Sequence, residues 1–315
     1  TQQQSRRVEG QSGEIRINVD IKKTSVLIVL ALLFISGIGR VDVAPDKYLK
    51  LGRQNEFSCV GQIIVDDDAS GSGVLICENL VLSAAHVFIL SDTQPDTLEI
   101  EGEKVVVFTP INDHPAKPEQ IMFKINGTYY KVKRITIHPT YLDKASEGAC
   151  DLALLELEQS VKGIKPAILN NQFNELKNEA VGVGYGVMAK ANESESVIDL
   201  KLKNAGQNVI DSIGGLKAGG QSTLLFCDFD APDRSDCNKM GSASPLPLEY
   251  VCSGGDSGGG LFIKRSNKWV LVGICSGSPL NINQLMKTGY YGSVMFWTRV
   301  SAFTDWIEEQ VQTME

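Results

Sequence analysis

The chain has 315 residues, of which 43% are hydrophobic, and a formal net charge of −8. This length and apolar content suffice for one two-barrel unit or for two small domains. The dispersed acidic charge, without a basic patch interleaved with aromatic residues, argues against nucleic-acid binding. The three histidines and seven cysteines have no spacing that fits a zinc cluster, so neither a metal nor another cofactor is expected.

The beginning of the chain has the pattern of a targeting segment. Lys22 and Lys23 precede an apolar run from Val26 to Ile35, and small residues follow. The run is too short to cross a bilayer. We therefore predict that residues 1–39 are an N-terminal extension with a cleaved signal peptide, and that residues 40–315 form a secreted or periplasmic domain without a stable membrane span. A membrane-tethered adhesion or signalling domain, anchored by the same run, is the alternative.

The rest of the chain has the pattern of an all-β protein. Short runs rich in β-branched and aromatic residues alternate with turn residues, which predicts a sandwich or a barrel. The predicted strands cover residues 62–65, 74–76, 104–108, 130–137, 152–157, 224–229, 261–264 and 269–275. At the end of the chain, Ser301 is predicted to cap a helix that carries Phe303 and Ile307 on one apolar face.

A serine lies among glycines in the run from Cys252 to Gly260. Glycines allow backbone N–H groups to approach a substrate carbonyl closely, with the Ser257 hydroxyl in front of it. A serine nucleophile needs a base and a group that orients the base. The same run fits the G-x-S-x-G elbow of α/β-hydrolases, but that fold places the histidine after the serine. No histidine follows Ser257, so the chain order excludes the elbow.

One histidine and one aspartate have the right surroundings to complete such a site. His86 follows an apolar strand and two small alanines, whereas His114 and His138 lie beside prolines and have the pattern of loop or strand-end residues. Asp151 opens an apolar run that ends at Leu157, which places it at the mouth of a predicted core strand. The order His86, Asp151, Ser257 is the order of the chymotrypsin arrangement.

From about Gly61 to its C-terminus, the chain resembles the trypsin/chymotrypsin-type serine endopeptidases, as a bacterial-like secreted member. The matching blocks cover residues 71–76, 82–86, 137–141, 151–155, 182–186, 255–259, 271–276 and 297–300. The resemblance implies an all-β fold of two six-stranded antiparallel barrels, with the active site between them. It also implies a C-terminal α-helix packed on the second barrel.

The resemblance also implies roles for individual residues. Ser257 would attack the scissile carbonyl, His86 would accept and return the proton, and Asp151 would hold the imidazole. The N–H groups of Gly255 and Ser257 would form the oxyanion hole. Ser276, Gly277 and Ser278 would line the substrate cleft.

The expected base of the specificity pocket lies at Tyr250 or Val251, depending on how the extra glycine is aligned. Neither position carries the aspartate of a trypsin-like pocket, so cleavage after Arg or Lys is not expected. We expect a small or apolar P1 residue, and Glu249 turned inward is the alternative that would select a base.

Asp256 precedes the nucleophile, where the family pairs an acid with a newly freed N-terminal ammonium. A buried carboxylate needs compensation, so a cationic partner is expected. The Ile-Val-Gly-Gly start of the family is absent, and cleavage after Arg40, which frees Val41, is a hypothesis.

The cysteines follow the predicted signal, which fits an oxidising compartment. The disulfide candidates are Cys227 with Cys237, which bracket one loop, and Cys252 and Cys275, which flank the strands of the expected pocket.

The expected partners are a polypeptide substrate and a possible proteinaceous inhibitor, and the protein is expected to be a monomer. A catalytically silent homologue, which binds a partner through the same cleft, is the competing hypothesis. Such homologues usually lose one of the three catalytic residues, and all three candidates are present here.

Overall fold

The computed structural model describes residues 37–100, 103–142, 150–191, 202–277 and 291–314. The predicted signal segment up to Ile35 and the predicted cleft residue Ser278 lie outside these ranges. The described chain divides into two units. One contains the hairpin of β5 (Ile89–Ile100) and β6 (Glu103–Pro115), which form a two-stranded sheet of their own, and the other contains everything described below.

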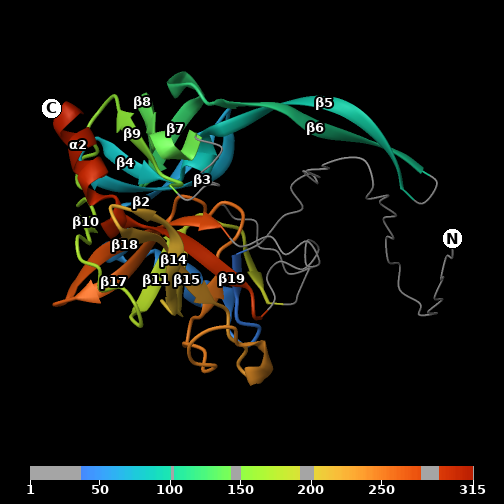
Figure 1. The fold of residues 1–315 in the computed structure, drawn as a ribbon, viewed down its shortest axis with the longest axis vertical. Coiled ribbons are helices and arrows are strands. Elements are labelled where there is room, and N and C mark those ends of the chain that lie inside the picture. The colour runs from blue at the N-terminus through green and yellow to red at the C-terminus, as the bar shows by residue number, and fades with distance from the viewer. Residues whose placement is uncertain (1–36, 101–102, 143–149, 192–201, 278–290, 315) are drawn as a thin grey trace. The chain divides into compact units, whose positions relative to one another are not determined.

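A closed six-stranded barrel forms the first half of the larger unit (Figure 1). Its strand order is β2-β3-β4-β9-β8-β7, and every neighbouring pair is antiparallel. The strands are β2 (Val60–Val65), β3 (Asp68–Cys77), β4 (Leu80–Ser83), β7 (Ile121–Ile125), β8 (Thr128–Ile137) and β9 (Ala153–Leu157). Alternating apolar side chains such as Ile63, Leu82 and Phe123 are fully buried inside it.

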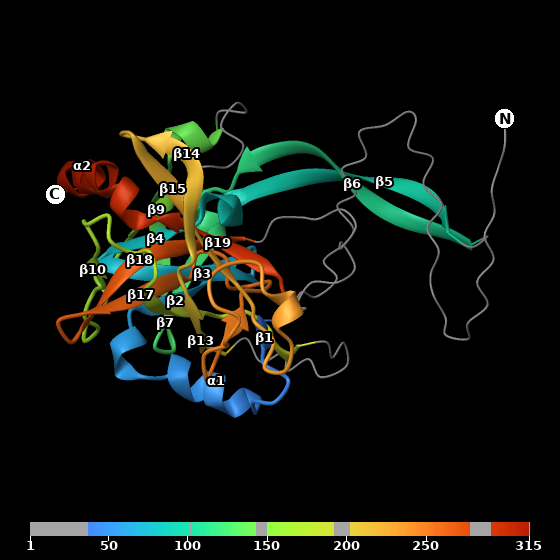
Figure 2. The same ribbon diagram turned by 60° about the horizontal axis from the view of Figure 1, so that its bottom comes forward.

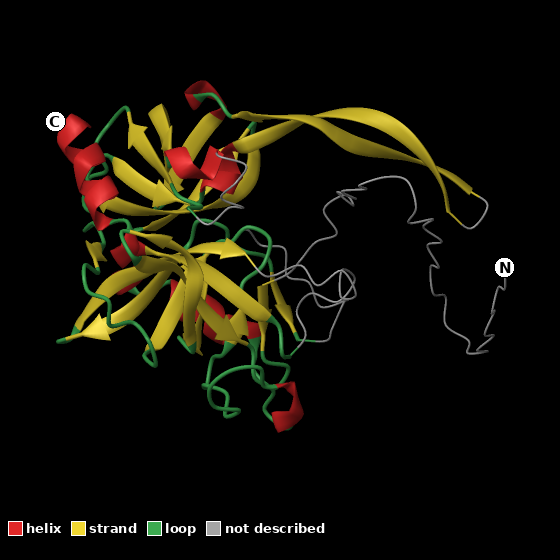
Figure 3. Ribbon diagram, viewed as in Figure 1, coloured by secondary structure: helices red, strands yellow, loops and turns green. Residues whose placement is uncertain are grey.

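A second antiparallel sheet forms the other half, as Figure 3 shows. Its order is β13 (Asn204–Val209), β11 (Glu179–Gly184), β17 (Gly260–Arg265), β18 (Lys268–Gly277), β19 (Val294–Arg299), β15 (Gln221–Asp228) and β14 (Ser212–Ala218), and β10 (Ile168–Leu169) pairs in parallel with β18. The strands β13 and β15 are not paired by a backbone ladder. Instead the Asn208 side chain of β13 donates to the Asp228 carbonyl of β15 at 2.7 Å. The predicted fold class is confirmed, and the second sheet has eight strands instead of six because β10 and β14 are added.

A small third sheet brings the N-terminal end of the described chain into the body. Its order is β12-β1-β16, where β1 (Gly37–Gly39) is parallel to β12 (Met188–Lys190) and antiparallel to β16 (Tyr250–Val251). The helix α1 (Pro45–Gly52) follows, with a proline in its first turn and the fully buried Tyr48 at its centre. The ordered body thus includes Gly37–Gly39, which the sequence analysis assigns to the N-terminal extension.

The C-terminal helix α2 (Thr304–Met314) packs against the first barrel rather than the second (Figure 2). The ring of His138, at the end of β8, lies 5.2 Å from the ring of Phe303 and 4.9 Å from that of Trp306. Ser301 lies in the short helix η8 (Val300–Ala302), and its hydroxyl donates to Glu175, so it is not the cap of α2. The predictions that α2 packs on the second barrel and that Ser301 caps it are therefore wrong.

Among the residues that the structure describes, five further single-turn helices lie between the longer elements. They are η1 (Asn55–Phe57), η2 (Ala85–Phe88), η3 (Pro118–Gln120), η4 (Pro139–Leu142) and η6 (Ser235–Cys237). Within the described ranges, no helix combines the length and the apolar character that a bilayer crossing requires.

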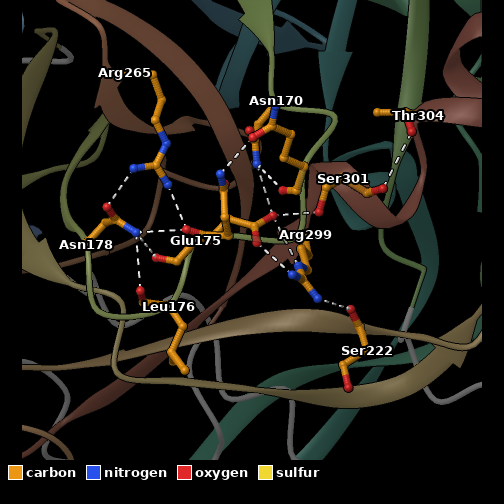
Figure 4. Close-up of polar contacts among 11 residues, drawn as sticks. Asn170, Glu175, Leu176, Asn178, Ser222, Arg265, Arg299, Ser301 and Thr304 are labelled. Atoms are coloured by element: carbon orange, nitrogen blue, oxygen red, sulfur yellow. Dashed lines mark hydrogen bonds and ion pairs between the residues drawn. The ribbon is translucent and has the colours of Figure 1, made fainter.

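A buried ion pair holds the end of β19 against the loop before β11 (Figure 4). Glu175 and Arg299 are 0% and 3% exposed, and the Nη2 to Oε2 distance is 2.6 Å. Ser301 and Asn170 donate to Glu175 Oε1, which also accepts Arg299 Nε–H, and Arg299 donates in addition to the Ser222 carbonyl. The desolvated charges are therefore fully hydrogen-bonded, which such a pair requires.

Replacement of Glu175 by glutamine should lower the free energy of unfolding by about 3–5 kcal/mol, because it leaves the Arg299 guanidinium buried without a counter-charge. Glu78→Gln, which breaks the exposed pair between Glu78 and Lys162, should cost at most about 1 kcal/mol. Denaturant unfolding of both variants measures the difference, and equal losses would contradict a specific role of the buried pair.

Candidate active site

The three candidate catalytic residues come from two neighbouring strands of the barrel and from one loop of the second sheet. In the pairing of β4 with β9, Ser83 faces Ala153. His86, just beyond the end of β4, and Asp151, just before the start of β9, therefore lie at the same end of the barrel. Ser257 lies in the turn that leads from β16 to β17.

These side chains form one continuous line of hydrogen bonds. His86 Nδ1 lies 2.7 Å from Asp151 Oδ2, and His86 Nε2 lies 2.7 Å from Ser257 Oγ. Asp151 is only 3% exposed, and its other oxygen accepts the His86 backbone N–H at 2.9 Å. Ser276 donates to Oδ2 at 2.5 Å, and Thr298 donates to the Asp151 carbonyl at 3.2 Å. The carboxylate is thus fixed from both halves of the fold.

Asp151 controls both the tautomer and the basicity of His86. A carboxylate at Nδ1 retains the proton there, so that Nε2 is free to accept the Ser257 hydroxyl proton. Burial alone lowers the pKa of His86, but the charge and the hydrogen bond of Asp151 outweigh burial and raise that pKa above its ordinary value of 6.5. The ring remains 35% exposed, which leaves it accessible from the solvent side.

We call the turn between β16 and β17 (residues 252–259), which carries Ser257, the nucleophile loop. Two of its peptide groups are anchored by their carbonyls. The Gly254 carbonyl accepts Val187 N–H at 3.1 Å, and the Asp256 carbonyl accepts Gly259 N–H at 2.8 Å. In a trans peptide the N–H points away from the C=O, so the N–H groups of Gly255 and Ser257 point away from these anchors. Within the described part of the chain, neither N–H donates a hydrogen bond. This leaves two donors available beside the Ser257 hydroxyl.

The glycines of this loop meet steric demands. Gly255 has a φ of +97°, and a Cβ on it would lie 2.8 Å from the Tyr185 carbonyl. Gly258 has a φ of +82°, and a Cβ there would lie 2.1 Å from the Ser83 hydroxyl. Side chains at either position would be excluded both by conformation and by space.

Asp256 has backbone donors in place of the expected cation. Its carboxylate accepts Gly186 N–H at 2.8 Å and Ser253 N–H at 3.0 Å. Burial raises its pKa to about 6, although these hydrogen bonds act in the opposite direction. The Val41 nitrogen, which the cleavage hypothesis would turn into the ammonium partner, donates to the Tyr291 hydroxyl instead. In the uncleaved chain the Asp256 carboxylate is therefore held by peptide N–H groups and by the Ser253 hydroxyl, and the cationic partner expected after cleavage stays a prediction.

The predicted substrate-binding residues divide into two groups. Ser276 and Gly277 lie at the end of β18 beside Asp151 and are partly exposed. Tyr250 and Val251 are almost completely buried, and the Tyr250 ring packs against Gly182 and Gly206 of the neighbouring strands. Tyr250 and Val251 are therefore core residues in this structure, and their role at the base of the specificity pocket stays a prediction.

Glu249 is also turned into the protein, where its carboxylate accepts the N–H groups of Asp230 and Leu246. It is 2% exposed, and burial raises its pKa to about 7. Those hydrogen bonds occupy both oxygens of the Glu249 carboxylate.

The candidate disulfide residues are thiols in the structure. Cys227, Cys237, Cys252 and Cys275 carry no disulfide bond. Cys252 Sγ lies 3.5 Å from Met295 Sδ and 3.6 Å from the Tyr250 hydroxyl. No group of His, Cys, Asp and Glu side chains in the described ranges is arranged to hold a metal ion.

Two residues of the site escape the sequence reasoning. Thr298 supports the Asp151 carbonyl, and Ser72 of β3 contacts the nucleophile loop. Thr298 lies in one of the matched blocks, but its hydroxyl has no local partner. Only the packing of β19 beside the start of β9 shows its use.

The fold and the site agree with the comparisons. The Trypsin family model matches residues 51–307, which is most of the chain. The chain belongs to the trypsin family. It is also similar to the CLIP domain-containing serine protease B4 of Anopheles gambiae, with 23% identity over 190 residues, which cover 57% of this chain and 46% of that protein. The match thus spans slightly less than half of that relative's length.

Proton NMR titration tests the electrostatics of the triad. His86 should titrate above pH 6.5, and in Asp151→Asn below 6.5, because the lowering effect of burial then acts alone. His86 therefore contributes stability that is present below pH 6.5 and is lost as the pH rises through its raised pKa. His138, whose pKa burial lowers, is an internal control that should not change. An unchanged His86 midpoint in the variant would contradict the assignment.

Proposed function

We propose that this trypsin-family domain is a serine endopeptidase that hydrolyses peptide bonds through an acyl-enzyme. Ser257 Oγ attacks the scissile carbonyl carbon while His86 Nε2 takes the hydroxyl proton. The C–N bond then breaks, and the imidazolium gives that proton to the leaving amine. A water molecule, deprotonated by the same imidazole, attacks the ester, and the proton returns to Ser257 as the acid product leaves.

The roles of the remaining groups follow from charge. Asp151 stabilises the imidazolium that forms in both steps and itself stays ionised. The N–H groups of Gly255 and Ser257 stabilise the oxyanion of each tetrahedral intermediate, where a single donor contributes roughly 10² to 10³ in turnover. The observation that carries the proposal is the line of two 2.7 Å contacts from Asp151 through His86 to Ser257, with two N–H groups available beside it.

The competing hypothesis is a catalytically silent binding module in the same cleft. A silent homologue has no need to maintain a base at hydrogen-bonding distance from a nucleophile. The ordering of the Asp151 carboxylate by Ser276 and by His86 N–H favours the enzyme, because this arrangement serves the charge of the imidazole.

We further propose a secreted protein that acts on polypeptides, with a possible proteinaceous inhibitor as partner and a monomeric state. The pattern of Lys22, Lys23 and the apolar run to Ile35 supports secretion.

A fluorophosphonate probe separates the enzyme from the silent homologue. The probe should label the wild-type protein at Ser257, and Ser257→Ala should abolish labelling. His86→Ala should slow labelling by several orders of magnitude, because the hydroxyl then lacks its base. Ser244→Ala, a change of an exposed serine, is the matched control and should label like wild type. A folded wild-type protein that resists the probe would support the silent homologue.

The cleavage preference is tested with a peptide library. We propose that P1 is small or apolar, because Glu249 is held by the N–H groups of Asp230 and Leu246 and no other acid occupies the two expected pocket positions. Cleavage products should accordingly end in small or apolar residues. Products that end mainly in Arg or Lys, lost in Glu249→Gln, would show that the Glu249 carboxylate contacts the P1 side chain during catalysis.

A further inference from the structure

Ser72 is a buried polar residue that connects the first barrel to the nucleophile loop. It lies in β3 and is 0% exposed. Its N–H donates to the Ser257 carbonyl at 2.7 Å, and its carbonyl accepts the Ser83 hydroxyl at 2.7 Å. Its own hydroxyl donates to the Gly255 carbonyl at 2.8 Å and accepts Tyr185 N–H at 2.9 Å. Every polar atom of Ser72 is therefore hydrogen-bonded.

The side-chain contact acts on the middle peptide of the loop. The carbonyls of Gly254 and Asp256 are anchored by backbone N–H groups, whereas the Gly255 carbonyl between them accepts the Ser72 hydroxyl. This peptide follows a glycine at a φ of +97°, where the chain itself imposes little restriction. The N–H of the same peptide, that of Asp256, donates to the Ser253 carbonyl within the loop at 2.9 Å. The carbonyl side of the peptide between the two oxyanion donors is consequently fixed from outside the loop, by Ser72.

The Ser72 hydroxyl also binds the segment of Tyr185 and Gly186, which in turn contacts the nucleophile loop. Tyr185 N–H donates to the Ser72 hydroxyl, and the next N–H along the chain, that of Gly186, donates to Asp256 Oδ1. Ser72 and Asp256 thus accept consecutive N–H groups of the same short segment. The loop is also pressed against β3, because a Cβ on Gly258 would lie 2.2 Å from the Ser72 carbonyl. A small side chain with one donor and one acceptor fits this space.

We propose that Ser72 is a positioning residue, which holds the nucleophile loop in the conformation that directs the oxyanion-hole N–H groups toward the substrate. The proposal rests on the proposed endopeptidase function. The hydroxyl contacts neither the triad side chains nor the two N–H groups of the oxyanion hole, and acts through the Gly255 carbonyl. Its removal should therefore weaken the binding of the transition state and leave the binding of the substrate ground state unchanged.

The test compares Ser72→Ala with Ser70→Ala, which removes a hydroxyl two residues earlier on the same strand. The Ser70 hydroxyl bonds only locally, to the Asp68 carbonyl. With rates normalised by active-site titration, Ser72→Ala should lower kcat about tenfold, as expected for one lost positioning hydrogen bond, with KM unchanged. The affinity for a peptide boronate, whose tetrahedral adduct occupies the oxyanion hole, should fall by the same factor. Ser70→Ala should match wild type in all three measurements.

Several outcomes would overturn the proposal. Loss of thermal stability in Ser72→Ala with an unchanged kcat per titrated site would reduce Ser72 to a packing role, and so would a rise in KM at constant kcat. If Ser72→Ala does not fold, Ser72→Cys decides the question, because a thiol retains a weak donor and should give a kcat between wild type and the tenfold loss. A wild-type protein without turnover or boronate binding refutes the proposed function itself. An active wild type with an unaffected Ser72 variant refutes only the role of Ser72.

Discussion

A single hydrogen bond between Ser257 Oγ and His86 Nε2 connects a side chain of the second sheet to one of the first barrel. Its 2.7 Å length requires the two halves of the fold to be placed with sub-ångström accuracy. The register of β4 and β9 brings His86 and Asp151 together, and the packing of the nucleophile loop on β3 brings Ser257 to them. Because glycines lie where the loop meets β3, the two backbones approach closely, and the Ser72 hydroxyl adds a hydrogen bond to the Gly255 carbonyl.

The buried carboxylates of this protein are compensated in different ways. Glu175 has a true counter-ion, Arg299, and its role is structural. Asp256 and Glu249 are held by peptide N–H groups without a cation, and burial raises the pKa of Asp256 to about 6 and that of Glu249 to about 7. Asp151 combines peptide and hydroxyl donors with the imidazole, and its charge raises the pKa of His86. The negative charge at the site is therefore directed to the group whose protonation state changes during the proposed reaction.

Local patterns were sufficient for much of this fold. The predicted runs lie within or almost within observed strands, because β-branched residues with alternating burial report directly on a half-buried strand. The candidate triad followed from chain order and from the character of the flanking residues. Strands such as β13 and β14 carried too many glycines and polar residues to be predicted, since sheet neighbours and not their own composition stabilise them.

Features that depend on tertiary contacts could not be predicted. Tyr250 occupies an expected pocket position, but the alternation of a strand turns its ring toward Gly182 and Gly206. β1 and α1 depend on Tyr48, whose hydroxyl accepts Arg40 N–H and donates to the Glu249 carbonyl, a partner far along the chain. Ser301 was predicted to be a helix cap from a local rule, whereas its hydroxyl donates to the distant Glu175 carboxylate. In each case a distant partner decides the direction of the side chain.

The central claim is that Ser257 forms a covalent bond with the substrate. Rapid-quench mass spectrometry of the intact protein with an ester substrate measures this directly. We expect a burst of alcohol product equal to the active-site concentration and a protein mass increased by one acyl group, located on Ser257. Turnover without an acylated protein, or an acyl group on another residue, would contradict it.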